Sequence, residues 1–164
     1  MTGRKQPPTS RITQPYIVAP EEQAAVEFFG HVARVRLGGE HSAGELAIID
    51  STMSRGSASP VHRHLHAAET FLVLEGTLRV RVDREEFSVG AGSAAVLPKL
   101  IDHAFLVTSD HARLLSLHTP AGFDEFVMGV GHPPELTDAA IDSEELARIA
   151  ARCGIELVGP PMTL

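Results

Sequence analysis

The chain has 164 residues and a formal net charge of −7 with its nine His taken as neutral. This length suits one domain, and 43% hydrophobic with 21% charged residues excludes a disordered or fibrous chain. No stretch of Lys and Arg is dense enough to neutralise phosphates, so we expect no nucleic-acid partner. The single cysteine, Cys153, excludes an intramolecular disulfide and a Cys-based zinc cluster, so any metal must be bound by His and carboxylate groups.

Residues 1–14 are polar and rich in Pro, Ser and Thr, and they lack the apolar run of a signal peptide. We interpret them as a flexible leader before a barrel core at residues 15–120. No window of the sequence approaches the roughly 18 consecutive apolar residues that span a bilayer. We therefore expect no membrane partner and a cytoplasmic location.

Short strands separated by turn residues follow the leader. The clearest is Thr77–Asp83, in which every second residue is Leu or Val and the others are polar. The other predicted strands are Tyr16–Val18, Glu27–Phe29, Val32–Leu37, Leu46–Thr52, Phe87–Val89, Ala94–Leu97, Ala104–Val107 and Arg113–Leu117. Many short strands with frequent turns predict an all-β sandwich or barrel.

The pattern changes to helical spacing in the last part of the chain. Phe123–Met128 and Ser143–Ala151 are predicted helices, and Gly154 is the stop signal of the second. We interpret residues 121–164 as a helical extension packed on the barrel. Order is expected to end at Gly159-Pro160-Pro161.

Four residues have the spacing of metal ligands. His62 and His64 are two apart in an extended segment, so their imidazoles project from one face of a strand. Glu69 follows His64 by an odd interval and would point to the opposite face of a straight strand. A turn at residues 65–68 is therefore required, after which a strand from Glu69 would run back beside the first. His103 would close the site from another wall.

This spacing resembles the motifs of the cupin family. Its first motif is matched at every fixed position by Gly56, five residues, His62-Arg63-His64, four residues, Glu69, six residues and Gly76. Its second motif is resembled by Gly92, five residues, Pro98 and then His103. The departures are Leu100, where the pattern has Gly, and Val107, where it often has Asn.

The resemblance extends over nearly the whole chain to the single-domain quercetinase-like cupins. It rests on the region from Tyr16 to Phe29, the Thr119–Phe123 corner and the Gly154–Glu156 segment. It implies a cupin jelly-roll barrel with a pocket between its sheets. It also implies one divalent transition metal, whose ligands would be His62, His64, Glu69 and His103. Nitrogen and oxygen ligands suit Fe, Mn, Co, Ni or Zn without selecting among them.

Other residues near the motifs are less distinctive. Phe71, Val73 and Phe105 share the strand parity of Glu69 or His103, so they either line the pocket or pack in the barrel core. We expect His66, in the turn, to be exposed. Five further histidines have no comparable spacing and are interpreted as surface or structural residues: His31, His41, His111, His118 and His132.

The leading functional hypothesis is a metal-dependent oxygenase acting on an aromatic or enolic small molecule such as a flavonol. Quercetinase-like similarity implies that the substrate binds the metal as an anion and that O2 then adds to it. It also implies a catalytic role for Glu69, which would take the substrate proton besides binding the metal.

Two alternatives remain open. The same ligands would serve a non-oxidative isomerase, cyclase or lyase in which the metal is a Lewis acid. They would also serve a non-catalytic binding module that contains a metal. A phosphorylated substrate is disfavoured unless Arg34, Arg36 or Lys99 enters the pocket. We expect a homodimer, because an edge strand near Tyr16 would be free to pair with a second copy.

Overall fold

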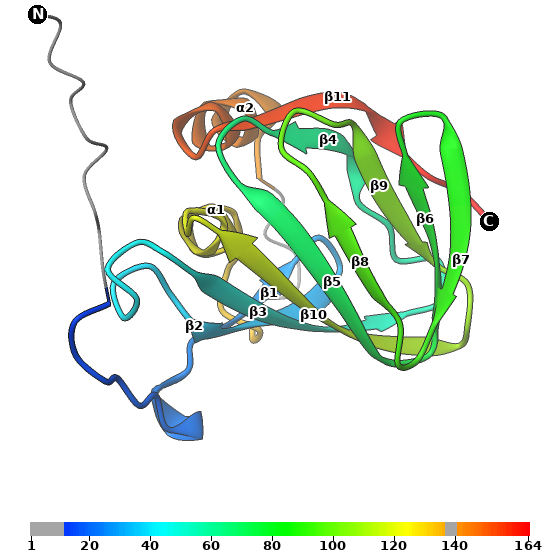
Figure 1. Ribbon diagram of the computed structural model, residues 1–164. Coiled ribbons are helices and arrows are strands. Elements are labelled where there is room, and N and C mark those ends of the chain that lie inside the picture. Colours follow the sequence, from blue (N-terminus) through cyan, green and yellow to red (C-terminus); the bar gives the residue numbers. More distant parts are fainter. Residues whose placement is uncertain (1–11, 137–140) are drawn as a thin grey trace, which may run out of the picture.

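The computed structural model describes residues 12–136 and 141–164, and Figure 1 shows them as two facing β-sheets with two helices at one end. One sheet has six strands in the order β1 (Ala25–Phe28), β2 (His31–Leu37), β3 (Ala47–Ser54), β10 (His111–Thr119), β5 (Ala68–Glu75) and β8 (Ala94–Leu97). The other has five, in the order β11 (Ile155–Pro161), β4 (Pro60–His64), β9 (His103–Val107), β6 (Thr77–Val82) and β7 (Glu85–Gly90). The predicted all-β jelly roll is confirmed.

Alternation along the strands explains which face of each sheet is buried. In β6, Leu78 and Val80 are buried, whereas Arg79 between them is partly exposed. In β10 the buried residues are Ala112, Leu114, Ser116 and His118. Since alternate side chains of a strand point to opposite faces, these residues all project into the space between the sheets.

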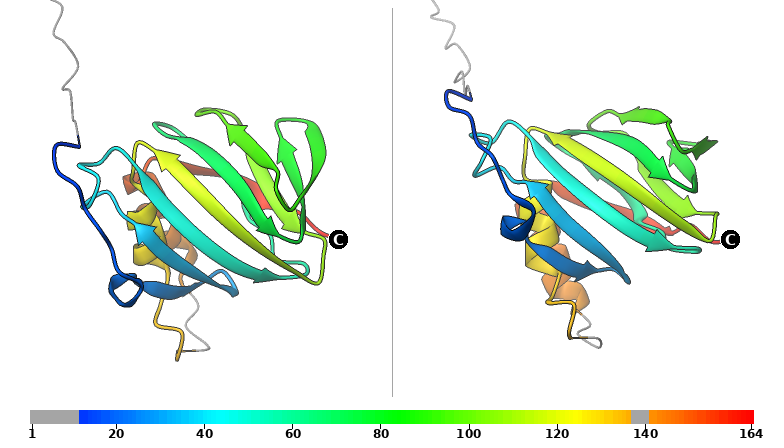
Figure 2. Two further views of the ribbon diagram at one scale, coloured as in Figure 1. Left: turned by 60° about the horizontal axis from the view of Figure 1, so that its bottom comes forward. Right: turned by 90° about the horizontal axis from the view of Figure 1, so that it is seen from below.

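Buried apolar residues form two clusters in that space. The first joins β1, β2, β3 and β11 to the helices and contains Val26, Phe28, Ala33, Ile49, Phe126, Val127, Val130, Ile149, Ala150 and Ile155. The second fills the other end of the barrel and contains Met53, Phe71, Val73, Leu78, Val80, Leu97, Val107, Ala112 and Leu114. Figure 2 shows how the two sheets enclose this interior.

Both predicted helices are present, as α1 (Phe123–Val130) and α2 (Ser143–Arg152), and they pack against each other beside β1 and β11. The extension is not purely helical, because β11 follows α2 and pairs with β4, which corrects the expectation that order ends at residue 159. Its prolines are tolerated since β11 is an edge strand. Within the described ranges, no helix has the length and apolarity needed to cross a bilayer.

The predicted strand at Tyr16–Val18 is wrong. This segment lies between Pro15 and Pro20, pairs with no strand, and leads into a short 3-10 helix, η1 (Pro20–Glu22). The sheet begins only at β1. The proposed homodimer therefore loses the edge strand that suggested it and stays a prediction. Residues 1–11 of the expected leader lie outside the described residues.

The two departures from the second motif are accommodated locally. Leu100 adopts a left-handed backbone conformation with φ of +68°, and its N–H donates to the carbonyl of His64 at 2.8 Å. The glycine-type turn is therefore retained without glycine. Val107 is fully buried in the second core cluster, so an apolar contact stands where the family often has an amide.

Replacing Leu100 by Gly should stabilise the protein. A non-glycine residue in the left-handed region costs about 1 kcal/mol, and the Leu100 side chain is 56% exposed, so little buried area would be lost. We expect the free energy of unfolding in urea to rise by about 0.5–1 kcal/mol for Leu100→Gly. Leu100→Ala is the control, since it removes the same side chain but keeps a Cβ; an equal gain in both variants would contradict backbone strain.

Candidate metal centre

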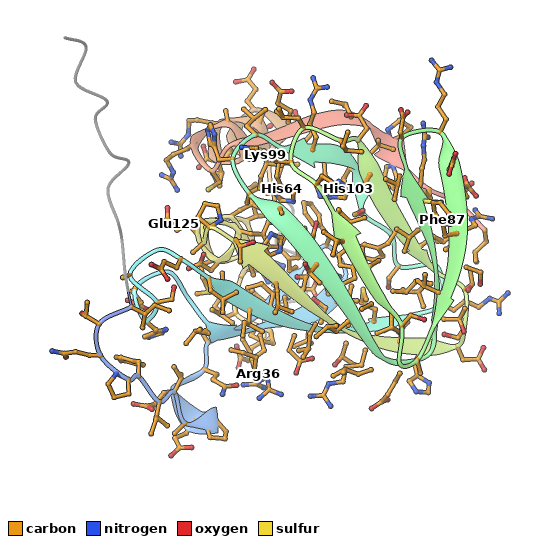
Figure 3. All side chains as sticks on the ribbon, viewed as in Figure 1. Arg36, His64, Phe87, Lys99, His103 and Glu125 are labelled. Atoms are coloured by element: carbon orange, nitrogen blue, oxygen red, sulfur yellow. The ribbon has the colours of Figure 1, made fainter. Side chains whose placement is uncertain are left out.

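The four predicted ligands come from both sheets and meet in the barrel interior. His62 and His64 lie on β4, and His103 lies on the neighbouring β9, where it pairs directly with His62. Glu69 lies on β5 in the opposite sheet. The turn at residues 65–67 is present, but the expectation that the strand of Glu69 runs back beside β4 is wrong, because the turn crosses from one sheet to the other. The labelled His64 and His103 lie in this interior in Figure 3.

All four side chains are buried, and one potential ligand atom of each lies within 4.8 Å of the others. The Oε2 atom of Glu69 is 3.0 Å from Nε2 of His103 and 3.3 Å from Nε2 of His64. The cluster is therefore small enough for a single ion to contact every residue in it.

Backbone carbonyls fix the orientation of two of the imidazoles. Nδ1 of His62 is 2.8 Å from the carbonyl oxygen of Pro60, and Nδ1 of His103 is 2.9 Å from that of Ile101. A carbonyl oxygen can only accept, so each Nδ1 carries the proton and donates it. The Nε2 lone pairs of both rings then point into the cluster, which is the tautomer that metal-binding histidines use.

Electrostatics at the cluster favour a bound cation. Burial, helped by the charge of His103, lowers the pKa of His62 to about 3, so this ring is neutral at neutral pH. Burial alone would raise the pKa of Glu69, but the neighbouring imidazoles, led by His118, hold it well below its usual range. Burial also opposes the charge on His103, yet the hydrogen bond and charge of Glu69 raise the pKa of His103.

The donor set fits a divalent transition metal. Nε2 of His103 and Oε2 of Glu69 lie 3.0 Å apart in a buried site, and a cation between them would relieve the repulsion of their lone pairs. Against the effect of burial, the same contact raises the pKa of His103, because a proton on this ring is attracted to the carboxylate. Three imidazole nitrogens and one carboxylate oxygen suit Fe, Mn, Co, Ni or Zn, as expected, and the roles of the four residues as ligands stay a prediction.

A cavity leads from the cluster between the two apolar cores. It is lined by Phe28, Phe29, His31, Ser51, Ala58, Ser59, Pro60, His62, Glu69, Phe71, Phe105, Leu114, Ser116, Phe123, Phe126, Ile155 and Leu157. Phe71 and Phe105 thus lie on the cavity wall, whereas Val73 packs in the second core cluster. The cavity is narrow, and with its open mouth it has a volume of about 660 Å³.

Two histidines at this site, His31 and His118, were missed by the sequence analysis, which interpreted them as surface or structural residues. His118 is fully buried, and its Nε2 atom lies 3.3 Å from Oε1 of Glu69. His31 lies on the cavity wall, where burial lowers its pKa to about 4 and keeps it neutral. Strand parity was the available signal for His118, because Leu114, Ser116 and His118 share the inward face of β10.

The other histidines lie away from the cluster. His66 is exposed, as expected, and so is His111. His41 and His132 are partly buried, outside the cavity wall. They fit the interpretation of surface or structural residues.

A jelly-roll barrel that gathers three imidazoles and a carboxylate from facing inner walls has the architecture of a metal-binding cupin. Residues 49–118 match the family model described as Cupin domain, and this range includes all four clustered residues. The chain therefore contains a cupin domain.

One curated relative is quercetin 2,3-dioxygenase of Bacillus subtilis (strain 168), which is 26% identical over 143 residues. The match covers 84% of this chain but 42% of the relative, so the chain spans less than half of that protein's length. The two proteins are distant homologues.

Solved structures agree on the fold. KdgF from a Halomonas species superposes with a TM-score of 0.58 at 17% identity, over 65% of this chain and 94% of that one. An RmlC-like cupin from Shewanella frigidimarina gives 0.57 at 21% identity, over 68% and 96%. Pac13, a nucleoside dehydratase, gives 0.56 at 15% identity, over 66% and 84%.

Metal titration tests the cluster. Chelator-treated protein should bind one Mn(II) or Co(II) per chain in calorimetry. His103→Ala should weaken binding by about 100-fold or more, because loss of a ligand exceeds the roughly 10- to 100-fold effect of outer residues. His111→Ala is the matched control, since it removes an exposed imidazole outside the cluster. Equal affinity in the two variants would refute the assignment, provided that circular dichroism shows both folded.

Proposed function

We propose that this protein is a metal-dependent oxygenase that acts on an aromatic or enolic small molecule, with O2 as co-substrate. The observation that carries the proposal is that His62 and Glu69, two residues of the buried cluster, line a cavity whose other walls include six phenylalanine rings. The distant quercetin 2,3-dioxygenase homologue supports the same chemistry. A bound divalent ion would supply a Lewis-acidic centre that stabilises an anionic substrate oxygen.

The cavity wall favours a planar, uncharged substrate. Six of its lining residues are phenylalanines: Phe28, Phe29, Phe71, Phe105, Phe123 and Phe126. Aromatic rings of a ligand pack well against such edges and faces. Because the cavity is narrow, a flavonol-sized substrate requires rings near the mouth to move, and Phe29, which is 39% exposed, is the freest of them.

Charge in the cavity argues against a phosphorylated substrate. Among the described residues, no Lys or Arg lines the cavity. Arg36 is paired with Asp50 through its Nη2 atom at 2.6 Å, and Figure 3 shows it on the side of the six-stranded sheet away from His64 and His103. Arg34 donates to the carbonyl of Gln23, and Lys99 is exposed. A phosphate in this cavity would have no cationic side chain to neutralise it.

His31 offers the substrate a second polar contact. It lies on the cavity wall beside Phe28, with the two rings edge to face at 5.7 Å between centroids. As a neutral imidazole it can donate or accept one hydrogen bond. A phenolic hydroxyl remote from the metal is the kind of group that it would recognise.

Oxygen consumption tests the proposed reaction. Protein stripped of metal should be reloaded separately with Fe, Mn, Co and Ni and offered quercetin and a panel of phenolic and enolic compounds. We expect oxygen uptake that matches substrate loss with at least one metal, and no uptake by His103→Ala. Substrate loss without oxygen uptake would instead establish an isomerase, cyclase or lyase. Metal binding without turnover of any compound would favour the binding module.

A second prediction concerns Glu69, whose carboxylate lines the cavity and stays ionised because its pKa is depressed. As an ionised carboxylate it has a lone pair for a substrate proton, and because its depressed pKa makes it a weak base, a bound metal would have to acidify the substrate hydroxyl for this transfer. Glu69→Gln should reduce turnover by about 100-fold or more at saturating metal, which is the usual contribution of a general base. Metal content should fall less. If turnover falls only in proportion to bound metal, Glu69 is a ligand and not a base.

A further inference from the structure

His118 lies directly behind the carboxylate of Glu69. The two residues are opposite each other in the register of β10 and β5, on the inward face of the six-stranded sheet. Nε2 of His118 is 3.3 Å from Oε1 of Glu69 and forms a hydrogen bond of 3.3 Å with the hydroxyl of Ser116. His118 is not one of the four clustered residues, so it contacts the outer oxygen of a candidate ligand and not the centre itself.

The carboxylate decides which nitrogen of His118 carries the proton. A lone pair on Nε2 would face the negative oxygen of Glu69 at 3.3 Å, whereas an N–H there is attracted to it. Nε2–H therefore donates to Ser116 and faces Glu69. Nδ1 is buried without a hydrogen-bond partner. Leaving an acceptor nitrogen unpaired there costs less free energy than leaving an N–H donor unpaired, which also favours the proton on Nε2.

Packing holds the His118 ring in this position. Its face stacks on Phe123, with centroids 4.2 Å apart and planes 17° apart, and the His64 ring approaches it edge to face at 5.1 Å. Phe123 is the first residue of α1, and the next residue, Asp124, accepts hydrogen bonds from the backbone N–H groups of Gly39 and Gly122. The first residue of α1 thus packs on the His118 ring, and hydrogen bonds from Gly39 and Gly122 fix the position of that end of the helix.

The two oxygens of Glu69 therefore have different surroundings. Oε2 faces His64 and His103, and Oε1 faces His118. We propose that His118 is a positioning residue that holds Oε1 away from a bound metal, so that Glu69 contributes one oxygen only. An octahedral ion with four protein ligand atoms keeps two positions for water or substrate, and a two-oxygen carboxylate would leave one. This inference rests on the proposed metal centre and specifies how that centre stays open.

The test compares His118→Gln with His118→Asn in the Mn(II)-loaded protein. The amide nitrogen of Gln reaches about as far along the side chain as Nε2 of His, whereas that of Asn reaches only as far as Nδ1. Both variants introduce a buried amide, so we expect them to lower the free energy of unfolding by similar amounts. The readouts are Mn(II) affinity by calorimetry and the number of exchangeable waters on the ion, from water-proton relaxation.

We expect His118→Asn to bind Mn(II) about 10-fold more weakly and to show one exchangeable water where the wild type shows two. His118→Gln should keep both properties close to wild type, and His111→Gln, at an exposed position, should keep them too. Equal water counts in the wild type and both His118 variants would overturn the positioning role while leaving the metal centre intact. A wild type that binds no Mn(II), Fe(II) or Co(II) would instead overturn the metal centre and this inference together.

Discussion

The site depends on one electrostatic constraint: electron-rich atoms of three imidazoles and a carboxylate are buried within 4.8 Å of one another. Burial removes the water that would otherwise screen them, so a cation among them is stabilised. The barrel satisfies the geometric side of this constraint by holding His62 and His103 on one sheet and Glu69 on the other. The backbone carbonyls of Pro60 and Ile101 set the tautomers of His62 and His103, because each accepts a hydrogen bond from Nδ1 and leaves the Nε2 lone pair facing the cluster.

Most of the fold and the cluster could be predicted from local pattern. Strand alternation located nearly all the strands, and motif spacing selected the residues that the structure brings together. The sequence could not show that Glu69 lies on the sheet opposite His62 and His64. Residue spacing across a turn does not say whether the chain re-enters the same sheet or crosses to the facing one. His118 was hidden for a similar reason: the run from Leu114 to Leu117 is nearly continuous in apolar residues, so parity alone could not orient it.

The cavity follows from the division of the core into two clusters. Phe28 and Phe126 belong to one cluster, and Phe71 and Leu114 belong to the other, so the space between them is walled by side chains that also stabilise the barrel. The shape of the cavity and the stability of the fold are thus determined by the same residues. Substitutions that widen the cavity would remove core contacts as well, which restricts how this barrel can change its ligand.

The strand β11 has a consequence for the order in which the molecule assembles. It pairs with β4 and so supports the backbone that carries His62 and His64, yet it follows both helices in the sequence. Bringing such distant segments together requires closure of a long loop, which makes this pairing slow relative to local hairpins. A nascent chain therefore presents its histidines before their wall is complete, and an ion that needs all four residues of the cluster would be bound only by the finished barrel.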